Sequence, residues 1–144
     1  MRIIGLDFGA KTTGVALSDP TGTIVSPEET ITREKEGKLR PTLRRIVELV
    51  REKEAELIVL GLPLNMDGSS GERAEKTRSF GADLEHRLEA EGLQVPVVLW
   101  DERLSTVGAD EILEEAAVAK SERKRYIDKI AAALILEDYI ANGP

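Results

Sequence analysis

Two apolar segments separated by only a short turn, at residues 2–6 and 13–18, constrain the fold of this chain most strongly. The first segment is mostly aliphatic without strict alternation, a pattern typical of a strand that is covered on both faces. Asp7 follows it directly, and the turn over residues 8–12 contains glycine. Strands joined by so short a turn pair antiparallel. The sequence therefore predicts a hairpin that presents an acidic side chain where its first strand ends.

The rest of the chain alternates between strand-like and helical patterns. Asp19–Gly22 is a strong turn signal, and the strand expected after it contains Pro27, which places that strand at a sheet edge. Ser69 and Glu72 have the spacing of a capping box that starts a helix. The predicted helices cover residues 38–54, 69–91, 105–118 and 125–141, and the further strands cover residues 23–32, 57–61 and 95–100.

This order of elements indicates a fold class. Three strands joined by short turns form an antiparallel meander, and the later strands return through helices by right-handed crossovers. We therefore expect an α/β fold with a mixed five-stranded sheet and helices on both faces, which is the order of the ribonuclease H-like fold. The 144 residues suffice for one domain with a real core, and no linker or repeat divides them. Residues 1–144 are thus predicted to be a single domain.

Composition excludes several kinds of site. The chain has no cysteine, which excludes disulfides, zinc fingers and thiol nucleophiles. Its one histidine, His86, lies in an amphipathic segment, so a Ser/His or Cys/His catalytic system is not expected. No apolar run is long enough to span a membrane and the N-terminus lacks a signal peptide, which favours a cytoplasmic protein without a membrane partner. The net charge of −7 leaves nucleic acid open as a partner, because binding depends on where Lys and Arg cluster.

Three acidic features fall at positions that such a sheet would bring together. Asp7 ends the first strand, and Asp101 and Glu102 end the last one. Asp128 is expected in the first turn of the C-terminal helix, and sites in open α/β sheets form at the carboxyl ends of strands. Adjacent carboxylates raise one another's pKa unless a cation lies between them, and oxygen ligands favour Mg²⁺ or Mn²⁺. Two such ions roughly 4 Å apart can promote phosphodiester cleavage without histidine.

Each acid also has a purely structural interpretation. Asp7 could accept hydrogen bonds from the amides of the following turn. Asp101 and Glu102 could stabilise the start of the next helix through its dipole, and Asp128 could pair with Lys124. Asp128 is the hardest to explain in this way, because the apolar residues that follow it at helical spacing direct it toward packed surface.

Residues near these acids are candidates for binding substrate. Lys11 lies in the first turn with Gly9 and nearby Gly14, and glycine there suggests close approach of a phosphate-bearing ligand. The loop that contains Asn65 and Asp67 leaves a strand at the same end of the predicted sheet. Its residues either contact substrate or merely reverse the chain.

Lysine and arginine gather in two places. One cluster brackets the first helix, and the second, from Lys120 to Arg125, immediately precedes Asp128. The second cluster either holds phosphates, which would make binding salt-dependent, or is a solvated helix start. Aromatic residues make up only 3% of the chain, so base stacking on single strands is not expected. The predicted substrate-binding residues are Lys11, Asn65, Arg103, Arg123, Lys124 and Arg125.

Four segments carry a resemblance to a known family. They are Gly5-Leu6-Asp7-Phe8-Gly9 with Gly14-Val15-Ala16, Gly61 to Gly68, Trp100-Asp101-Glu102-Arg103-Leu104-Ser105-Thr106, and Asp128 to Leu136. In this order they resemble the YqgF/RuvX family of Holliday junction resolvases, which are also assigned as nucleases that mature pre-16S ribosomal RNA. The resemblance covers essentially the whole chain. It implies a ribonuclease H-like fold and a nuclease site in which Asp7, Glu102 and Asp128 are catalytic and bind Mg²⁺ or Mn²⁺, with Asp101 the weaker claimant.

The resulting hypothesis is a metal-dependent endonuclease that acts in 5′-end maturation of pre-16S rRNA, with branched DNA in recombination or repair as the alternative substrate. A pre-30S ribosomal particle is then an expected partner, and the protein is expected to be a monomer or a weak homodimer. Two hypotheses from other classes are a non-catalytic RNA- or ribosome-binding module and an ATPase of the actin and sugar-kinase type. The ATPase is disfavoured because those proteins bury ATP between two domains, of which this chain is expected to provide one.

Overall fold

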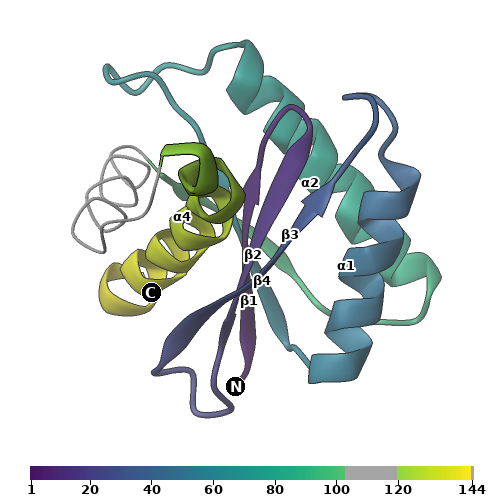
Figure 1. Ribbon diagram of the computed structural model, residues 1–144. Helices are drawn as coiled ribbons and strands as arrows, with labels where there is room; N and C mark the ends of the chain where they lie inside the picture. The colour runs from purple at the N-terminus through teal and green to yellow at the C-terminus, as the bar shows by residue number, and fades with distance from the viewer. Residues whose placement is uncertain (103–119, 144) are drawn as a thin grey trace.

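Five strands form one mixed sheet in the computed structural model, which describes residues 1–102 and 120–143 (Figure 1). The strands are β1 (Ile3–Phe8), β2 (Thr12–Ser18), β3 (Val25–Thr32), β4 (Leu57–Leu62) and β5 (Val97–Asp101), in the order β3-β2-β1-β4-β5. The described helices are α1 (Arg40–Lys53), α2 (Glu72–Ala90) and α4 (Lys120–Asn142). None of these described helices combines the length and apolar character that crossing a membrane requires. The helix predicted at 105–118 lies outside the described residues.

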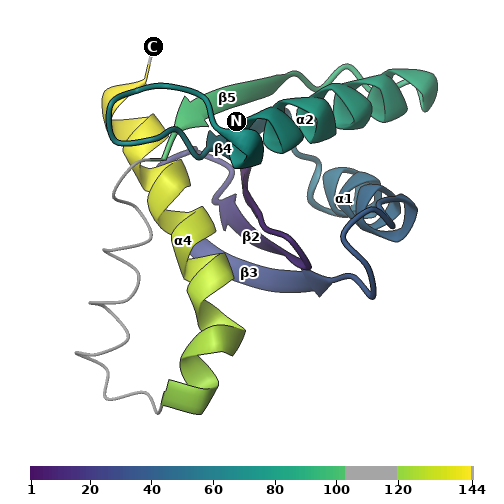
Figure 2. The same cartoon turned by 90° about the horizontal axis from the view of Figure 1, so that it is seen from above.

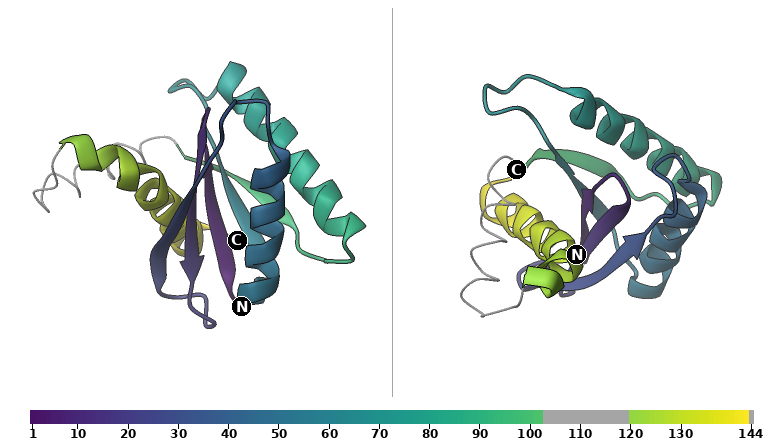
Figure 3. Two further views of the ribbon diagram at one scale, coloured as in Figure 1. Left: turned by 45° about the vertical axis from the view of Figure 1, so that its right-hand side comes forward. Right: turned by 45° about the horizontal axis from the view of Figure 1, so that its top comes forward.

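The pairing directions confirm the predicted topology. β1 pairs antiparallel with β2, and β2 with β3, whereas β4 pairs parallel with both β1 and β5. α1 and α2 cover one face of the sheet and α4 covers the other, as Figures 2 and 3 show. β3 is an edge strand, as Pro27 predicted, and its register with β2 shifts between Val15 and Ala16. The fold is therefore the expected mixed α/β sheet with helices on both faces.

The directions of the strands bring several parts of the chain to one end of the sheet, where β1, β4 and β5 terminate. This end is called the sheet edge below. β1, β4 and β5 run parallel, so their carboxyl ends lie at the same end of the sheet. The antiparallel β2 begins at this end. Asp7, Thr12, the loop after Leu62 and Glu102 all lie at this edge. Residues far apart in the sequence thus meet where open α/β sheets usually form their sites.

Alternation along β1 explains why its apolar run has no simple period. Ile4 and Leu6 belong to the core beneath α1 and α2, whereas Ile3 belongs to a second core beneath α4. Both cores are shielded from solvent, since Ile46 of α1 and Ile135 of α4 are each 0% exposed. A strand covered on both faces uses apolar residues at successive positions, as the sequence predicted.

Close packing of α4 depends on glycine at the sheet surface. A Cβ atom at Gly5 of β1 would lie 2.8 Å from Leu136 Cβ and 3.0 Å from the carbonyl oxygen of Ala132. A Cβ atom at Gly61 of the neighbouring β4 would lie 2.5 Å from Ile135 Cδ1. Protein interiors do not tolerate such overlap, so α4 can lie at this depth only because both positions lack a side chain.

The predicted start of α2 was wrong. The helix begins at Glu72 with Gly71 as its N-cap, and no side chain caps it. Ser69 was expected to form a capping box, but its backbone amide and hydroxyl donate instead to Oδ1 of Asp67, at 2.9 and 2.6 Å. Serine forms such local bonds readily, and here they hold the loop rather than the helix terminus.

The predicted start of α4 was also wrong. The helix begins at Lys120 rather than at residue 125. Residues 120–125 were interpreted as a polar segment that precedes the helix. They contain neither Gly nor Pro and are rich in Lys, Arg and Glu, which favour helix. Asp128 consequently lies in about the third turn of α4 rather than the first. The helix dipole, which acts mainly within the terminal turn, therefore does not explain an acid at this position.

Gly5→Ala is expected to destabilise the protein, because its methyl group would press against α4. Overpacking of this kind lowers the free energy of unfolding by about 1–3 kcal/mol, which urea denaturation followed by circular dichroism measures. Gly37→Ala is the matched control and is expected to be neutral, since no atom lies within 4 Å of a Cβ atom there. Equal stability of the two variants would contradict the close-packing argument.

Candidate active site

Carboxylates from three separate elements lie at the end of the sheet where β1 ends. Asp7 of β1 lies on the face that α4 covers, and Asp128 projects from α4 itself. Trp100 of β5 packs in the core beneath α4, so alternation places Glu102 on that face and Asp101 on the other. Asp7 thus lies near both Glu102 and Asp128, whereas alternation directs the Asp101 side chain to the other face of the sheet, from where its charge still raises the pKa of Glu102.

Glu102 is held beneath α4 by its neighbours. Its backbone amide donates to the Leu62 carbonyl at 3.2 Å, which continues the β4–β5 pairing by one residue. A Cβ atom at Gly61 would lie 2.5 Å from Glu102 Oε2, so the carboxyl group occupies space that glycine leaves. Two residues earlier, the indole N–H of Trp100 donates to Asp138 of α4 at 2.7 Å. The end of β5 is therefore fixed to both β4 and α4.

The backbone of α4 touches β2 at Asp128. Gly14 is the β2 residue that pairs with Asp7, and a Cβ atom at Gly14 would overlap the carbonyl oxygen of Asp128. Glycine at this position therefore sets α4 beside Asp7. The prediction that Gly14 admits a phosphate-bearing ligand was wrong, because the helix backbone occupies that space. At Gly9 a Cβ atom would lie 3.0 Å from the carbonyl oxygen of Thr12, within the same turn.

Thr12 is a site residue that the sequence analysis missed. Its hydroxyl donates a hydrogen bond to Oδ2 of Asp128, which ties the first residue of β2 to α4. The bond orients the Asp128 carboxylate at the rim of the site. No local sequence pattern signals this contact, because 116 positions separate the two residues.

Asp7 and Glu102 share a hydrogen bond at partly buried positions. Burial, followed by the charge of Asp128, raises the pKa of Asp7 from 3.8 to about 6. Burial, followed by the charge of Asp7 and the hydrogen bond with it, raises the pKa of Glu102 from 4.5 to about 8. Without a metal, Glu102 is therefore protonated at neutral pH and donates to an ionised Asp7.

The donor set fits a hard divalent cation. Oε2 of Glu102 is buried and has no hydrogen-bond partner among the described residues. A buried oxygen without a partner is unfavourable, and a cation would satisfy it. In residues 1–102 and 120–143, no three acidic or histidine side chains are already arranged as a metal cage. Binding would therefore require Glu102 to lose its proton and the carboxylates to turn toward the ion.

Arg73 of α2 places positive charge near the acid pair. Its guanidinium donates to the carbonyl oxygen of Phe8 at 3.3 Å. Its charge lowers the pKa of both Asp7 and Glu102, against the larger effect of burial. No local pattern in the sequence singles out Arg73, because its contact with β1 depends on how α2 packs against the sheet.

Arg33 holds the turn that carries Lys11. It is 7% exposed, and its guanidinium donates to the carbonyl oxygens of Gly9 and Ala10, the latter at 2.7 Å. Its backbone amide also donates to the carbonyl of Lys11 at 2.7 Å. In the sequence Arg33 belongs to the basic cluster that brackets the first helix, but in the structure it supports the β1–β2 turn from inside.

The predicted substrate-binding residues have different positions. Lys11 is exposed in the β1–β2 turn, at the same edge of the sheet as the acids. Asn65 lies in the exposed loop after β4, where its side-chain amide donates to the Ser69 hydroxyl at 3.0 Å. Arg103 lies outside the described residues. Arg123, Lys124 and Arg125 belong to α4, but their side chains are outside the described part of the chain.

Comparison with known protein families shows which family the chain resembles over nearly its whole length. The profile of the family described as "RuvX: Holliday junction resolvase" matches residues 1–142. The chain belongs to the RuvX family. This confirms the resemblance carried by the four sequence segments. A Lachnospira eligens protein named "Putative pre-16S rRNA nuclease" is 53% identical over 140 residues, which cover 97% of this chain and 96% of the relative. A protein of the same name from Listeria monocytogenes is 48% identical and covers 97% of each chain.

Solved structures confirm the fold of this RuvX family member. RuvC of Thermus thermophilus in complex with a Holliday junction substrate superimposes with a TM-score of 0.59 at 14% identity, over 99% of this chain and 96% of that chain. The yeast mitochondrial Holliday junction resolvase superimposes with a TM-score of 0.50 at 11% identity, over 96% of this chain and 77% of that chain. At such low identity these likenesses establish the ribonuclease H-like fold alone.

The free energy of unfolding of the metal-free protein is expected to fall as pH rises from about 4 to about 8. The pKa values of Asp7 and Glu102 are raised to about 6 and about 8 in the folded protein. The folded state therefore binds protons more tightly than the unfolded chain, and it loses that stabilisation as the protons dissociate. Urea denaturation in EDTA across this range measures the effect.

Glu102→Gln, which cannot titrate, is expected to flatten the upper part of this pH profile. Glu89→Gln, at an exposed position of α2, is the matched control and is expected to keep the wild-type slope. Identical slopes for all three proteins would contradict the shared-proton arrangement.

Proposed function

We propose that this protein is a divalent-metal-dependent nuclease that hydrolyses phosphodiester bonds at the sheet edge beside α4. The observation that carries the proposal is the convergence of Asp7, Glu102 and Asp128, with one buried oxygen of Glu102 left without a partner among the described residues. Membership of a family described as Holliday junction resolvases supports the reaction class. In this proposal the three acids are both the catalytic residues and the metal ligands.

Mg²⁺ or Mn²⁺ is the proposed cofactor. The available donors are carboxylate oxygens, and a chain with no cysteine and one histidine offers no softer set. One or two such ions would supply positive charge against the developing charge of the cleaved phosphate and would lower the pKa of an attacking water.

The protein's own groups arrange this chemistry. Asp7 is the central acid, because it forms a hydrogen bond with Glu102 and the charge of Asp128 raises its pKa. Thr12 holds the Asp128 carboxylate, so α4 presents it in a fixed orientation. Lys11, exposed at the same edge, is placed to attract a phosphate backbone. The edge therefore combines negative groups for a cation with a positive group for a polyanion.

Structured precursor RNA is the proposed substrate, in 5′-end maturation of pre-16S rRNA. The names of relatives at 53% and 48% identity support this choice, and those relatives match this chain over nearly their whole length. A pre-30S ribosomal particle is the corresponding partner, and the cytoplasm is the corresponding location.

Branched DNA is the second candidate substrate. The family description supports it, and so does the likeness of the fold to RuvC bound to a Holliday junction. Both substrates require the same phosphodiester chemistry, so the acid site alone does not distinguish them. A direct comparison of cleavage rates does.

Asp7→Asn and Glu102→Gln are each expected to lower the cleavage rate at least about 100-fold, because each removes a charged group at the reacting centre. Asp101→Asn is the matched control, and we expect it to stay within about tenfold of wild type, since its side chain lies on the other face of the sheet. Single-turnover cleavage with Mg²⁺ or Mn²⁺ measures the rates, and thermal melts verify folding. Full activity of Asp7→Asn on every nucleic acid would refute the site.

Wild-type protein is expected to cut a pre-16S leader RNA faster than a four-way DNA junction, and EDTA is expected to stop both reactions. The two substrates are compared in one assay at equal salt, because phosphate contacts make affinity salt-dependent. A faster reaction on the junction would favour the resolvase. Tight RNA binding without divalent ions, and no cleavage with them, would instead identify a non-catalytic binding module.

A further inference from the structure

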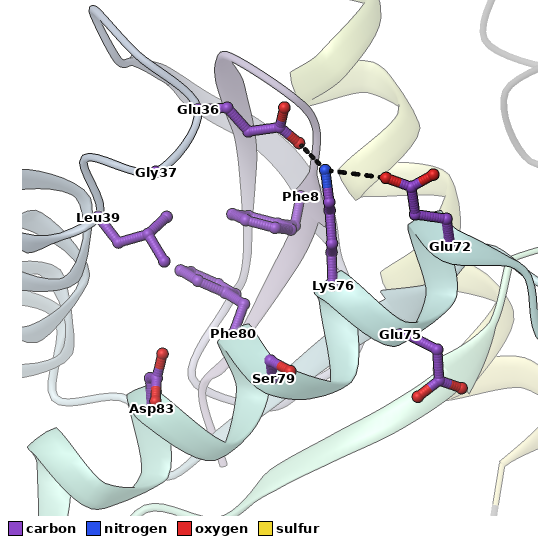
Figure 4. Close-up of a pocket in the computed structure, with 10 residues that line it drawn as sticks. All are labelled: Phe8, Glu36, Gly37, Leu39, Glu72, Glu75, Lys76, Ser79, Phe80 and Asp83. Carbon is purple, nitrogen blue, oxygen red and sulfur yellow. Dashed lines mark hydrogen bonds and ion pairs between the residues drawn. The ribbon is translucent and has the colours of Figure 1, made fainter.

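A cavity of about 500 Å³ lies between α2 and the segment that precedes α1 (Figure 4). It is separate from the acid site. Phe8 of β1 lines it, and although Phe8 follows Asp7 in the chain, alternation points their side chains to opposite faces of the sheet. Nothing in the proposed nuclease chemistry uses this cavity.

Two buried aromatic rings lie at the base of the cavity, Phe8 with 6% and Phe80 with 1% of its surface exposed. Phe8 and Phe80 are stacked with ring centroids 4.1 Å apart and planes inclined by 10°. Leu39 extends this apolar wall, as Figure 4 shows. The guanidinium carbons of Arg33 and Arg73 lie 4.7 and 5.1 Å from the Phe8 centroid, so the ring is held in place. A fixed apolar wall of this kind suits an apolar side chain of a ligand.

Carboxylates dominate the rim. The lining contains four carboxylates and a single ammonium group, that of Lys76. Lys76 bridges Glu36 and Glu72 at 3.1 and 3.3 Å (Figure 4). Arg73 also pairs with Glu36 at 2.8 Å and Arg78 with Glu75 at 3.7 Å, so these three carboxylates are compensated. The fourth, Asp83, makes no hydrogen bond or ion pair with any described residue. An uncompensated negative charge beside an apolar wall favours a cationic partner.

One wall of the cavity follows α2 along its length. Glu72, Lys76, Ser79 and Asp83 recur at helical spacing and all line the cavity. From the first to the last of them the helix rises roughly 16 Å, at about 1.5 Å per residue. That length corresponds to about five residues of extended chain at roughly 3.3 Å each. The dimensions therefore favour a linear segment over a compact ligand.

We propose that this cavity is a docking site for a protein segment in which an apolar side chain is flanked by lysine or arginine. The apolar side chain packs against Leu39, with the rings of Phe8 and Phe80 behind it, and a flanking cation pairs with Asp83. A nucleic-acid backbone is a poor occupant, because the rim carboxylates repel phosphate. A basic protein bound here leaves the acids on the opposite face open to nucleic acid.

The probe is a fluorescein-labelled peptide of about six residues with central phenylalanines between pairs of lysines, matching the length of the wall. It is expected to bind the full chain saturably in fluorescence anisotropy and to shift the amide resonances of Phe8, Leu39 and residues 72–83. Asp83→Lys and Ser79→Trp are each expected to weaken binding by about tenfold or more. The first reverses the rim charge, and the second fills the cavity from an exposed helix position.

Two controls distinguish this site from general attraction to an acidic protein. Glu89→Lys makes a comparable charge reversal at an exposed α2 position outside the cavity, and the affinity is expected to stay unchanged. Asp7→Asn is also expected to bind the peptide as wild type does, so loss of nuclease activity and loss of docking remain separable. Equal weakening by Glu89→Lys and Asp83→Lys would overturn the proposal.

The chemistry of the occupant is tested with altered probes. Peptides with glutamate in place of lysine, or alanine in place of phenylalanine, are expected not to bind. Phenethylamine that bound as tightly as the peptide would overturn the assignment to a protein segment in favour of a small cation. Absence of saturable peptide binding to the folded wild-type chain would overturn the docking site itself.

Discussion

The depth at which α4 lies against the sheet is the constraint on which the rest of the structure depends. Gly14, Gly5 and Gly61, on the adjacent strands β2, β1 and β4, remove the side chains that would otherwise separate the helix from the sheet. Only at this depth can the backbone at Asp128 touch β2, and only then does its carboxylate influence Asp7. The geometry of the acid site is therefore determined by missing side chains as much as by the acids themselves.

The acids in turn impose a competition between protons and cations. Burial and like charge disfavour three ionised carboxylates in one place, and the metal-free protein relieves this by keeping a proton on Glu102. A divalent ion needs the same carboxylate in its ionised form. In the proposed metal site, metal affinity, proton affinity and folding stability would therefore be linked through one side chain, and acidification would weaken metal binding.

Local patterns in the sequence were enough to predict the order of the strands and helices, because hydrophobic period and turn residues act over short distances. They did not decide between Asp101 and Glu102, which only the family resemblance ranked, because the choice depends on which face of the sheet the end of the strand presents to α4. They failed at the start of α2, where hydrogen bonds inside the loop decide how Ser69 is used. They could not reveal Thr12 or Arg73, whose partners are 116 and 65 positions away.

The single tryptophan of the chain lies where the last strand meets α4. Trp100 lies two residues before Glu102 in the chain. Its indole N–H donates to Asp138, and its ring centroid lies 5.3 Å from that of Tyr139. Its fluorescence emission therefore reports how much solvent reaches this contact. The emission moves to longer wavelength if the helix separates from the sheet, and it stays unchanged if only Asp7, Glu102 or Asp128 is replaced. The protein thus carries an intrinsic optical reporter of whether the helix that bears Asp128 is docked.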